Sequence, residues 1–206
     1  MKSKMKFLGL LGILAILFSF SFKSLNTTKT VIIDAGHGGM DAGATFEDKC
    51  ESKIVLGIAN KIYQLNKQKN IKIILLRNTD EFIRLNDRVS KVNEIKPDLL
   101  ISLHTNSSKD TIRSGIDAFV SKETKENSFY NQSKDIAQSL IEQVSGKNLT
   151  QGKVSEANLV LLRGVECPAV MLEVGFLSNK KDRDYITSEE GQTEIATKIL
   201  ETLEND

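Results

Sequence analysis

Apolar and polar positions alternate along this chain in two patterns, one typical of buried strands and one typical of amphipathic helices. Residues 30–34 form a β-branched apolar run that predicts a buried parallel strand. A helical repeat follows, carried by Ile54, Leu56, Ile58, Ile62 and Leu65. Because a second apolar run occupies residues 71–76, this part of the chain predicts a β-α-β unit.

The same alternation continues to the end of the chain. Further strands are predicted at residues 98–103, 115–120, 159–162 and 169–174, and further helices at residues 84–93, 133–144 and 188–203. Alternating strands and helices are typical of an α/β fold, and 206 residues with 40% hydrophobic composition suit one domain with a sizeable core. We therefore expect a single α/β domain over residues 30–206, after a polar linker at residues 23–29.

The first 22 residues differ from the rest in composition. Lys2, Lys4 and Lys6 precede an uncharged run from Phe7 to Phe22, which is the layout of an export signal. As a helix, this run would be about 24 Å long, shorter than the roughly 30 Å hydrocarbon core of a bilayer. Cleavage of a signal peptide is therefore favoured over an uncleaved signal anchor. Either form predicts an exported protein of the periplasm or cell envelope.

Charge bears on the kind of partner, and the cysteine positions bear on whether a disulfide forms. From Ser24 onward the chain carries 24 basic and 27 acidic residues, because four of its 28 Lys and Arg residues precede that point. This balance gives no electrostatic case for binding nucleic acid. Cys50 and Cys167 are predicted at opposite ends of the strands, about 20 Å apart along a six-residue strand, so no disulfide is expected.

The two histidines of the chain both lie where a predicted strand gives way to a loop. His37 lies in a glycine-rich loop, and His104 follows the strand at residues 98–103. Strand ends at one edge of an open α/β sheet converge on a single crevice, so the two imidazoles are expected to meet there. Asp34, three residues before His37, is a candidate to orient an imidazole, with a turn-stabilising contact as the alternative.

Two carboxylates are candidates to join the histidines. Glu51 begins the predicted helix, although the helix dipole alone would favour an acidic residue there, and Glu47 and Asp48 compete by position. Glu173 lies within the apolar run at residues 168–176, where a carboxylate needs a cation or a salt-bridge partner. Two histidines and one carboxylate are a recurring catalytic zinc set, so the pattern indicates metal-assisted hydrolysis with Glu173 as the base.

Several spaced motifs resemble one family, the zinc-dependent N-acetylmuramoyl-L-alanine amidases. The matching segments are Asp34-Ala-Gly-His-Gly-Gly39, Glu51, Leu76-Arg-Asn-Thr-Asp80, Arg84, Ser102-Leu-His-Thr-Asn106, Gly115-Ile-Asp117, Leu161-Leu-Arg163 and Pro168 to Asn179. The resemblance covers nearly all of the chain after the predicted signal. Ser52 and Asp117 depart from it, standing where the family often has Lys and Glu.

The resemblance implies a fold, an activity and a partner. The fold would be a three-layer α/β/α domain with a mixed, mostly parallel sheet and its active site at the carboxyl-terminal strand edge. The reaction would be hydrolysis of the amide between N-acetylmuramic acid and L-alanine in peptidoglycan, with one Zn²⁺ per chain and a zinc-bound water activated by Glu173. The implied zinc ligands are His37, Glu51 and His104. Asn106 and Arg163 would line the substrate groove, or serve capping and surface roles.

The sequence is also compatible with two other functions. A zinc carboxypeptidase-like hydrolase would use a similar ligand set, and a catalytically silent peptidoglycan-binding protein could keep the fold. An activator protein is a further candidate partner, although the roughly forty residues between Asp117 and Leu159 leave no room for a long autoinhibitory insertion. A monomer is favoured.

Overall fold

The computed structural model describes residues 28–122 and 128–205. The predicted export segment at residues 1–22 and most of the predicted linker lie outside these ranges. Within the described ranges, none of the helices has the length and apolar character needed to cross a membrane.

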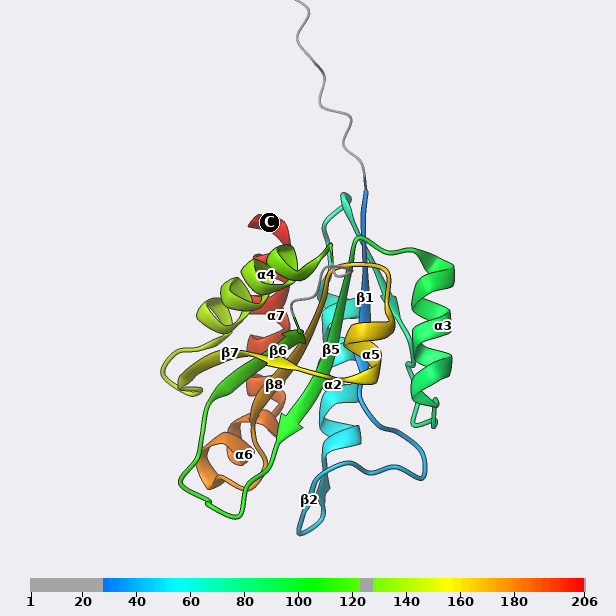
Figure 1. Cartoon of the computed structure of the whole chain (residues 1–206). Helices are drawn as coiled ribbons and strands as arrows, with labels where there is room; N and C mark the ends of the chain where they lie inside the picture. Colours follow the sequence, from blue (N-terminus) through cyan, green and yellow to red (C-terminus); the bar gives the residue numbers. More distant parts are fainter. Residues whose placement is uncertain (1–27, 123–127, 206) are drawn as a thin grey trace, which may run out of the picture.

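A six-stranded mixed sheet forms the centre of the fold (Figure 1). Its strands, in spatial order, are β4 (Ile71–Leu75), β1 (Lys29–Ala35), β5 (Leu99–Asn106), β8 (Ala169–Phe176), β6 (Ile116–Ser121) and β7 (Gln151–Ala157). The first four strands are parallel, whereas β6 pairs antiparallel with β8 and parallel with β7. The predicted mixed, mostly parallel sheet is confirmed.

Helices cover both faces of the sheet. They are α2 (Glu51–Leu65), α3 (Leu85–Ile95), α4 (Tyr130–Val144), α5 (Val160–Gly164), α6 (Lys180–Ile186) and α7 (Glu189–Asn205), and a small hairpin of β2 (Thr45–Phe46) and β3 (Lys49–Cys50) precedes α2. One buried cluster joins the sheet to α2, α4 and α7, and a second joins it to α3 and α5. The chain is therefore the expected single three-layer α/β/α domain.

Strand alternation explains the two clusters. Val31 and Ile33 of β1 point into the cluster beneath α2, whereas Ile32 between them points into the cluster beneath α3 and α5. All three side chains are fully buried. Because both faces of β1 are covered, its sequence is continuously apolar, as expected for a central parallel strand.

The strand predicted at residues 159–162 is wrong. The strand in this part of the chain is β7, at Gln151–Ala157, and residues 160–164 form the short helix α5. β7 lies at the edge of the sheet and leaves much of its surface exposed, so its sequence lacks an apolar run. Of the apolar residues that suggested a strand, Leu161 and Leu162 instead form the buried side of α5.

The segment between Asp117 and Leu159 contains β6, α4 and β7. In the part of it that the structure describes, α4 is the one helix, and it packs against the sheet and α7. Cys50 and Cys167 are both free thiols.

Candidate metal centre

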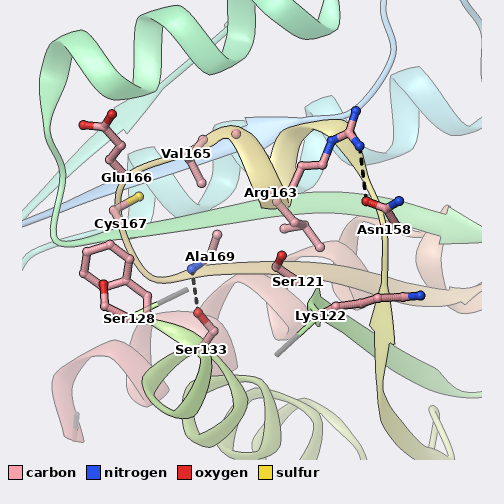
Figure 2. Close-up of a pocket in the computed structure, with 13 residues that line it drawn as sticks. Ser121, Lys122, Ser128, Ser133, Asn158, Arg163, Val165, Glu166, Cys167 and Ala169 are labelled. Carbon is pink, nitrogen blue, oxygen red and sulfur yellow. Dashed lines mark hydrogen bonds between the residues drawn. The ribbon is translucent and has the colours of Figure 1, made fainter. Parts of the chain in front are cut away.

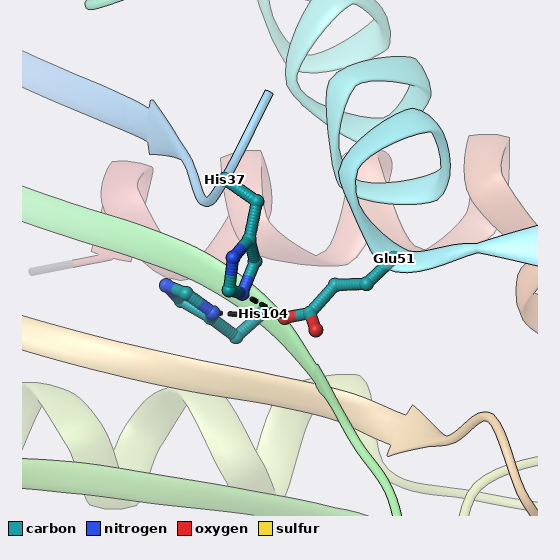
Figure 3. Close-up of side chains that lie close together, drawn as sticks. All are labelled: His37, Glu51 and His104. Atoms are coloured by element: carbon teal, nitrogen blue, oxygen red, sulfur yellow. Dashed lines mark hydrogen bonds and ion pairs between the residues drawn. The ribbon is translucent and has the colours of Figure 1, made fainter. Parts of the chain in front are cut away.

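Three of the predicted site residues meet at the carboxyl-terminal edge of the parallel strands. His37 follows β1, Glu51 is the first residue of α2, and His104 lies near the end of β5. One potential ligand atom from each lies within 4.8 Å of the other two (Figure 3). The structure therefore assembles two imidazoles and one carboxylate that could hold a metal ion.

The Glu51 carboxylate is the hub of this cluster. Its Oε1 atom lies 2.8 Å from His104 Nδ1 and 3.2 Å from His37 Nε2, and it also accepts a hydrogen bond from the Thr105 backbone N–H. Its Oε2 atom accepts one from the Ala44 N–H at 2.8 Å. Glu51 is only 4% exposed, so these bonds both compensate its buried charge and fix its orientation.

Mutual hydrogen bonding shifts the pKa values of the cluster. The hydrogen bond to Glu51 raises the pKa of His37 to about 9; burial opposes this rise, and a hydrogen bond to Asp41 adds to it. For Glu51, burial alone would raise the pKa, but the hydrogen bonds to His104 and His37 outweigh it and lower the pKa well below the usual range. In the metal-free protein, His37 therefore keeps a proton at neutral pH.

The residue that orients His37 is Asp41, and the prediction of this role for Asp34 is wrong. His37 Nδ1 lies 2.8 Å from Asp41 Oδ2. Asp34 instead accepts hydrogen bonds from Arg88 Nη1 and from Ser102 Oγ. Asp41 reaches the imidazole because the loop folds back, with reciprocal backbone bonds between Gly38 and Asp41. The glycines of this loop are the sequence signal for such a reversal.

Two glycines leave space for the cluster. A Cβ atom on Gly36 would lie 2.4 Å from the His104 ring, and one on Gly43 would lie 2.6 Å from both Glu51 Oε2 and the His37 ring. Gly43 also has a φ of +66°, a conformation that L-residues with side chains adopt rarely. The two positions bring the backbone close to the imidazoles and the carboxylate.

Two buried arginines, which no local sequence pattern marks as site residues, hold the segments that carry the cluster. Arg77 Nη2 donates to the carbonyls of Gly36 and Ser52, each at 2.8 Å, so one guanidinium joins the His37 loop to the first turn of α2. Arg88 donates to the His37 carbonyl at 2.5 Å and to Asp34. Both arginines are almost fully buried, at 1% and 2% exposure.

Glu173 lies beside the cluster on the neighbouring strand. It pairs in register with His104, and its Oε2 atom is buried with no hydrogen-bond partner in the structure. None of the ion pairs among the described residues includes it, which argues against a structural salt bridge. Burial raises its pKa to about 7; the charge of His104 opposes this rise, and those of Glu51 and Asp117 add to it.

Asn106 and Arg163 occupy different places. Asn106 ends β5, and its side-chain oxygen accepts a hydrogen bond from the Ser107 N–H, which is a local capping contact. Arg163 lies in α5, 3.3 Å from the Asn158 side chain, and lines a cavity of about 700 Å³ (Figure 2). Neither histidine lines that cavity. The structure therefore does not bring Arg163 to the candidate metal centre.

A second cavity, of about 470 Å³, opens directly at the metal centre. His37 and His104 are among the residues that line it. Its walls come from the start of α3 and from α5. We call this cavity the α3–α5 cleft. It is lined by Asp34, Gly36, His37, Asp41, Phe82, Ile83, Leu85, Arg88, His104, Leu159, Val160, Leu161 and Met171.

Comparison with known proteins identifies the family. Residues 31–205 match the sequence profile of the N-acetylmuramoyl-L-alanine amidases. The chain belongs to this family. The resemblance drawn from the spaced motifs is thereby confirmed, and the enzyme class it implies is that of amide hydrolases.

Individual relatives in the amidase family agree in sequence and fold. The chain is 31% identical to the probable cell wall amidase LytH of Staphylococcus saprophyticus, over 85% of this chain and 57% of that protein, so it spans little more than half of LytH. An N-acetylmuramoyl-L-alanine amidase from Clostridium difficile 630 superposes with a TM-score of 0.79 at 29% identity, covering 87% of this chain and 96% of that one. The CwlD amidase of Clostridioides difficile, solved in complex with the GerS lipoprotein, has a TM-score of 0.76 at 28% identity and covers 86% and 100%.

Proposed function

We propose that this protein is a zinc-dependent amidase that hydrolyses the amide bond between N-acetylmuramic acid and L-alanine of the peptidoglycan stem peptide. The observation that carries the proposal is the clustering of His37, Glu51 and His104 within 4.8 Å, beside the unpartnered carboxylate of Glu173. Membership of the amidase family supplies the reaction class.

The residues present fit one zinc ion per chain. Two imidazole nitrogens and one carboxylate oxygen are a donor set that catalytic zinc sites use, and three protein ligands leave a position open for water or substrate. A bound zinc ion would polarise the scissile carbonyl and make water at the open position more acidic. The hydrogen bonds of Glu51 and of Asp41 would keep the ligand atoms in place for it.

Glu173 is proposed as the catalytic base. Its carboxylate would accept a proton from the attacking water and then deliver that proton to the departing amine of L-alanine. A pKa raised to about 7 suits both steps at neutral pH, because the group can be deprotonated before attack and protonated after it. The buried Oε2 atom has no hydrogen-bond partner among the described residues, so it is available for this exchange.

The alternatives have less support. A carboxypeptidase-like enzyme would need a free guanidinium to bind a terminal carboxylate. The arginine that lines the α3–α5 cleft is Arg88, which is buried and bonded to Asp34 and to backbone carbonyls. A silent binding protein would have no chemical need for the three clustered residues and the buried Glu173. Neither alternative explains the three clustered residues and the buried Glu173 as well as the amidase reaction does.

The relatives and the amino-terminal sequence support a proposal on localisation and partners. We propose that the protein is exported and acts on the cell wall, since LytH is a probable cell wall amidase and residues 1–22 have the layout of an export signal. Because CwlD was solved with a lipoprotein, an exported partner protein is a second candidate for binding this chain.

Digestion of purified peptidoglycan by residues 24–206 tests the proposal. We expect mass analysis to find free stem peptides with an L-alanine amino terminus, lost after chelation and restored by zinc. Release of peptides cut at another bond would favour the carboxypeptidase-like alternative. If the zinc-loaded protein binds peptidoglycan but releases nothing, even from short soluble muramyl peptides, the silent-binder alternative would replace the proposal.

A further inference from the structure

The walls of the α3–α5 cleft are apolar. Its seven apolar lining residues are Phe82, Ile83 and Leu85 on the α3 side, Leu159, Val160 and Leu161 on the α5 side, and Met171 of β8 between them. Phe82 and Leu85 are 44% and 55% exposed, so the α3 wall presents large apolar side chains to solvent. Apolar side chains left exposed around a cavity are a feature of ligand-binding sites.

The cleft is continuous with the metal centre. Side chains alternate along a strand, so His104 of β5 points to the same face as Leu100, and Glu173 of β8 to the same face as Met171. Leu100 and Met171 belong to the apolar cluster beneath α3 and α5. The cleft therefore offers a place beside His104 for one of the two groups that flank the scissile amide.

Charge decides which of the two groups suits the cleft. Arg88 is the one Lys or Arg residue among its lining residues, and it is 2% exposed and already paired with Asp34. The remaining carboxylate, Asp41, is bonded to His37. A stem peptide, which carries carboxylates beyond its first alanine, would lose hydration against these apolar walls without gaining a counter-charge from them. The muramyl residue is uncharged once its lactyl carboxyl is in the amide.

We propose that the α3–α5 cleft binds the N-acetylmuramyl sugar, with the Phe82 ring as its main contact; this rests on the proposed amidase function. The C–H faces of the pyranose ring and the acetyl methyl group are the apolar surfaces that such walls match. Phe82 is held in place because Gly39 packs against it: a Cβ atom on Gly39 would lie 2.8 Å from the Phe82 backbone nitrogen. The Gly39 N–H also donates to Asp80 at 2.9 Å, which fixes one loop on the other.

Two soluble substrates with the same stem peptide test this assignment. One is an N-acetylmuramyl tripeptide, and the other is the D-lactoyl tripeptide, which keeps the scissile amide but lacks the sugar. Each is offered to zinc-loaded wild type, Phe82→Ala and the control Tyr63→Ala, which removes an aromatic ring 58% exposed on α2 outside the cleft. Affinities are also measured by calorimetry in a Glu173→Gln background, so that a slowly cleaved ligand still gives a result.

We expect Phe82→Ala to weaken binding and lower kcat/KM for the muramyl tripeptide by about tenfold, and to change neither value for the lactoyl tripeptide by more than about twofold. Tyr63→Ala should leave both substrates unaffected. An equal loss on both substrates would overturn the sugar assignment and place the peptide in the cleft. No loss on either would also overturn it. If wild type cleaves neither substrate, the proposed function itself fails, and this assignment fails with it.

Discussion

His104 and Glu173 are register partners on the adjacent parallel strands β5 and β8. Paired residues on neighbouring strands lie about 4.8 Å apart and share a face of the sheet, so the backbone places the carboxylate next to the imidazole. The register shifts directly after this pair, between His104 and Asn106. The relative position of the proposed ligand and the proposed base is therefore set by sheet pairing, which is more rigid than a loop.

Separate roles for Glu173 and His37 predict separate losses. Glu173→Gln should keep one zinc per chain and lower kcat by at least ~10²-fold, since the amide cannot accept the proton. His37→Ala should lose both zinc and activity, because it removes a ligand. Metal analysis after dialysis, combined with peptide release, checks both. Equal loss of zinc in the two variants would contradict the assignment of Glu173 as base.

Zinc binding should release a proton from His37. Its pKa of about 9 means that this imidazole is protonated at pH 7.5 in the metal-free protein, and a metal can bind only the neutral form. Zinc affinity should therefore rise with pH by up to about tenfold per unit until pH 9. Calorimetric titration in two buffers of different ionisation enthalpy measures the proton released. An affinity that is flat between pH 7 and pH 9 would contradict this prediction.

The buried carboxylate of Glu173 should make the metal-free protein less stable at higher pH. Its folded-state pKa of about 7 exceeds the unfolded value, so the folded state binds more protons between about pH 4.5 and 7, and its free energy of unfolding falls as pH rises through that window. The difference is at most roughly 3 kcal/mol.

Glu173→Gln isolates this effect, because the amide mimics the protonated acid. We expect the variant to be more stable than wild type at pH 8 and about equal to it at pH 4.5, measured by denaturant unfolding with a chelator present. A difference of the same size at both pH values would show that the carboxylate charge is not responsible.

Arg77 should affect zinc affinity without touching the metal. Arg77→Lys removes the guanidinium Nη2 that donates to both the Gly36 and Ser52 carbonyls, so the His37 loop and the start of α2 lose this link between them. We expect zinc affinity to fall about 10- to 100-fold, as for other groups that support metal ligands. Zinc competition with a chromophoric chelator measures this. The control is Arg113→Lys, at an exposed residue whose guanidinium lies over the Phe176 ring.

A loss of stability alone would give a different result. If Arg77→Lys lowers the unfolding free energy of the metal-free protein but leaves its zinc affinity unchanged, Arg77 supports the core and does not position the ligands.

The features that could be predicted from the sequence are those that a local residue pattern determines. The central strands have apolar runs because both of their faces are covered, and His37, Glu51 and His104 were found because each lies next to such a run or begins the helical repeat. β7 was missed because an edge strand can be polar. The role of Asp41 depends on a folded-back loop, and the roles of Arg77 and Arg88 depend on contacts across 25 to 54 residues of chain, which no local pattern encodes.

Gly36 and Gly43 have a consequence for how this chain tolerates variation. Neither position can carry a side chain without displacing an imidazole or the Glu51 carboxylate. In a scan of all substitutions, both should therefore be as intolerant as the residues that perform the chemistry. Mutational sensitivity alone would class them as catalytic, although their contribution is the volume that they leave empty.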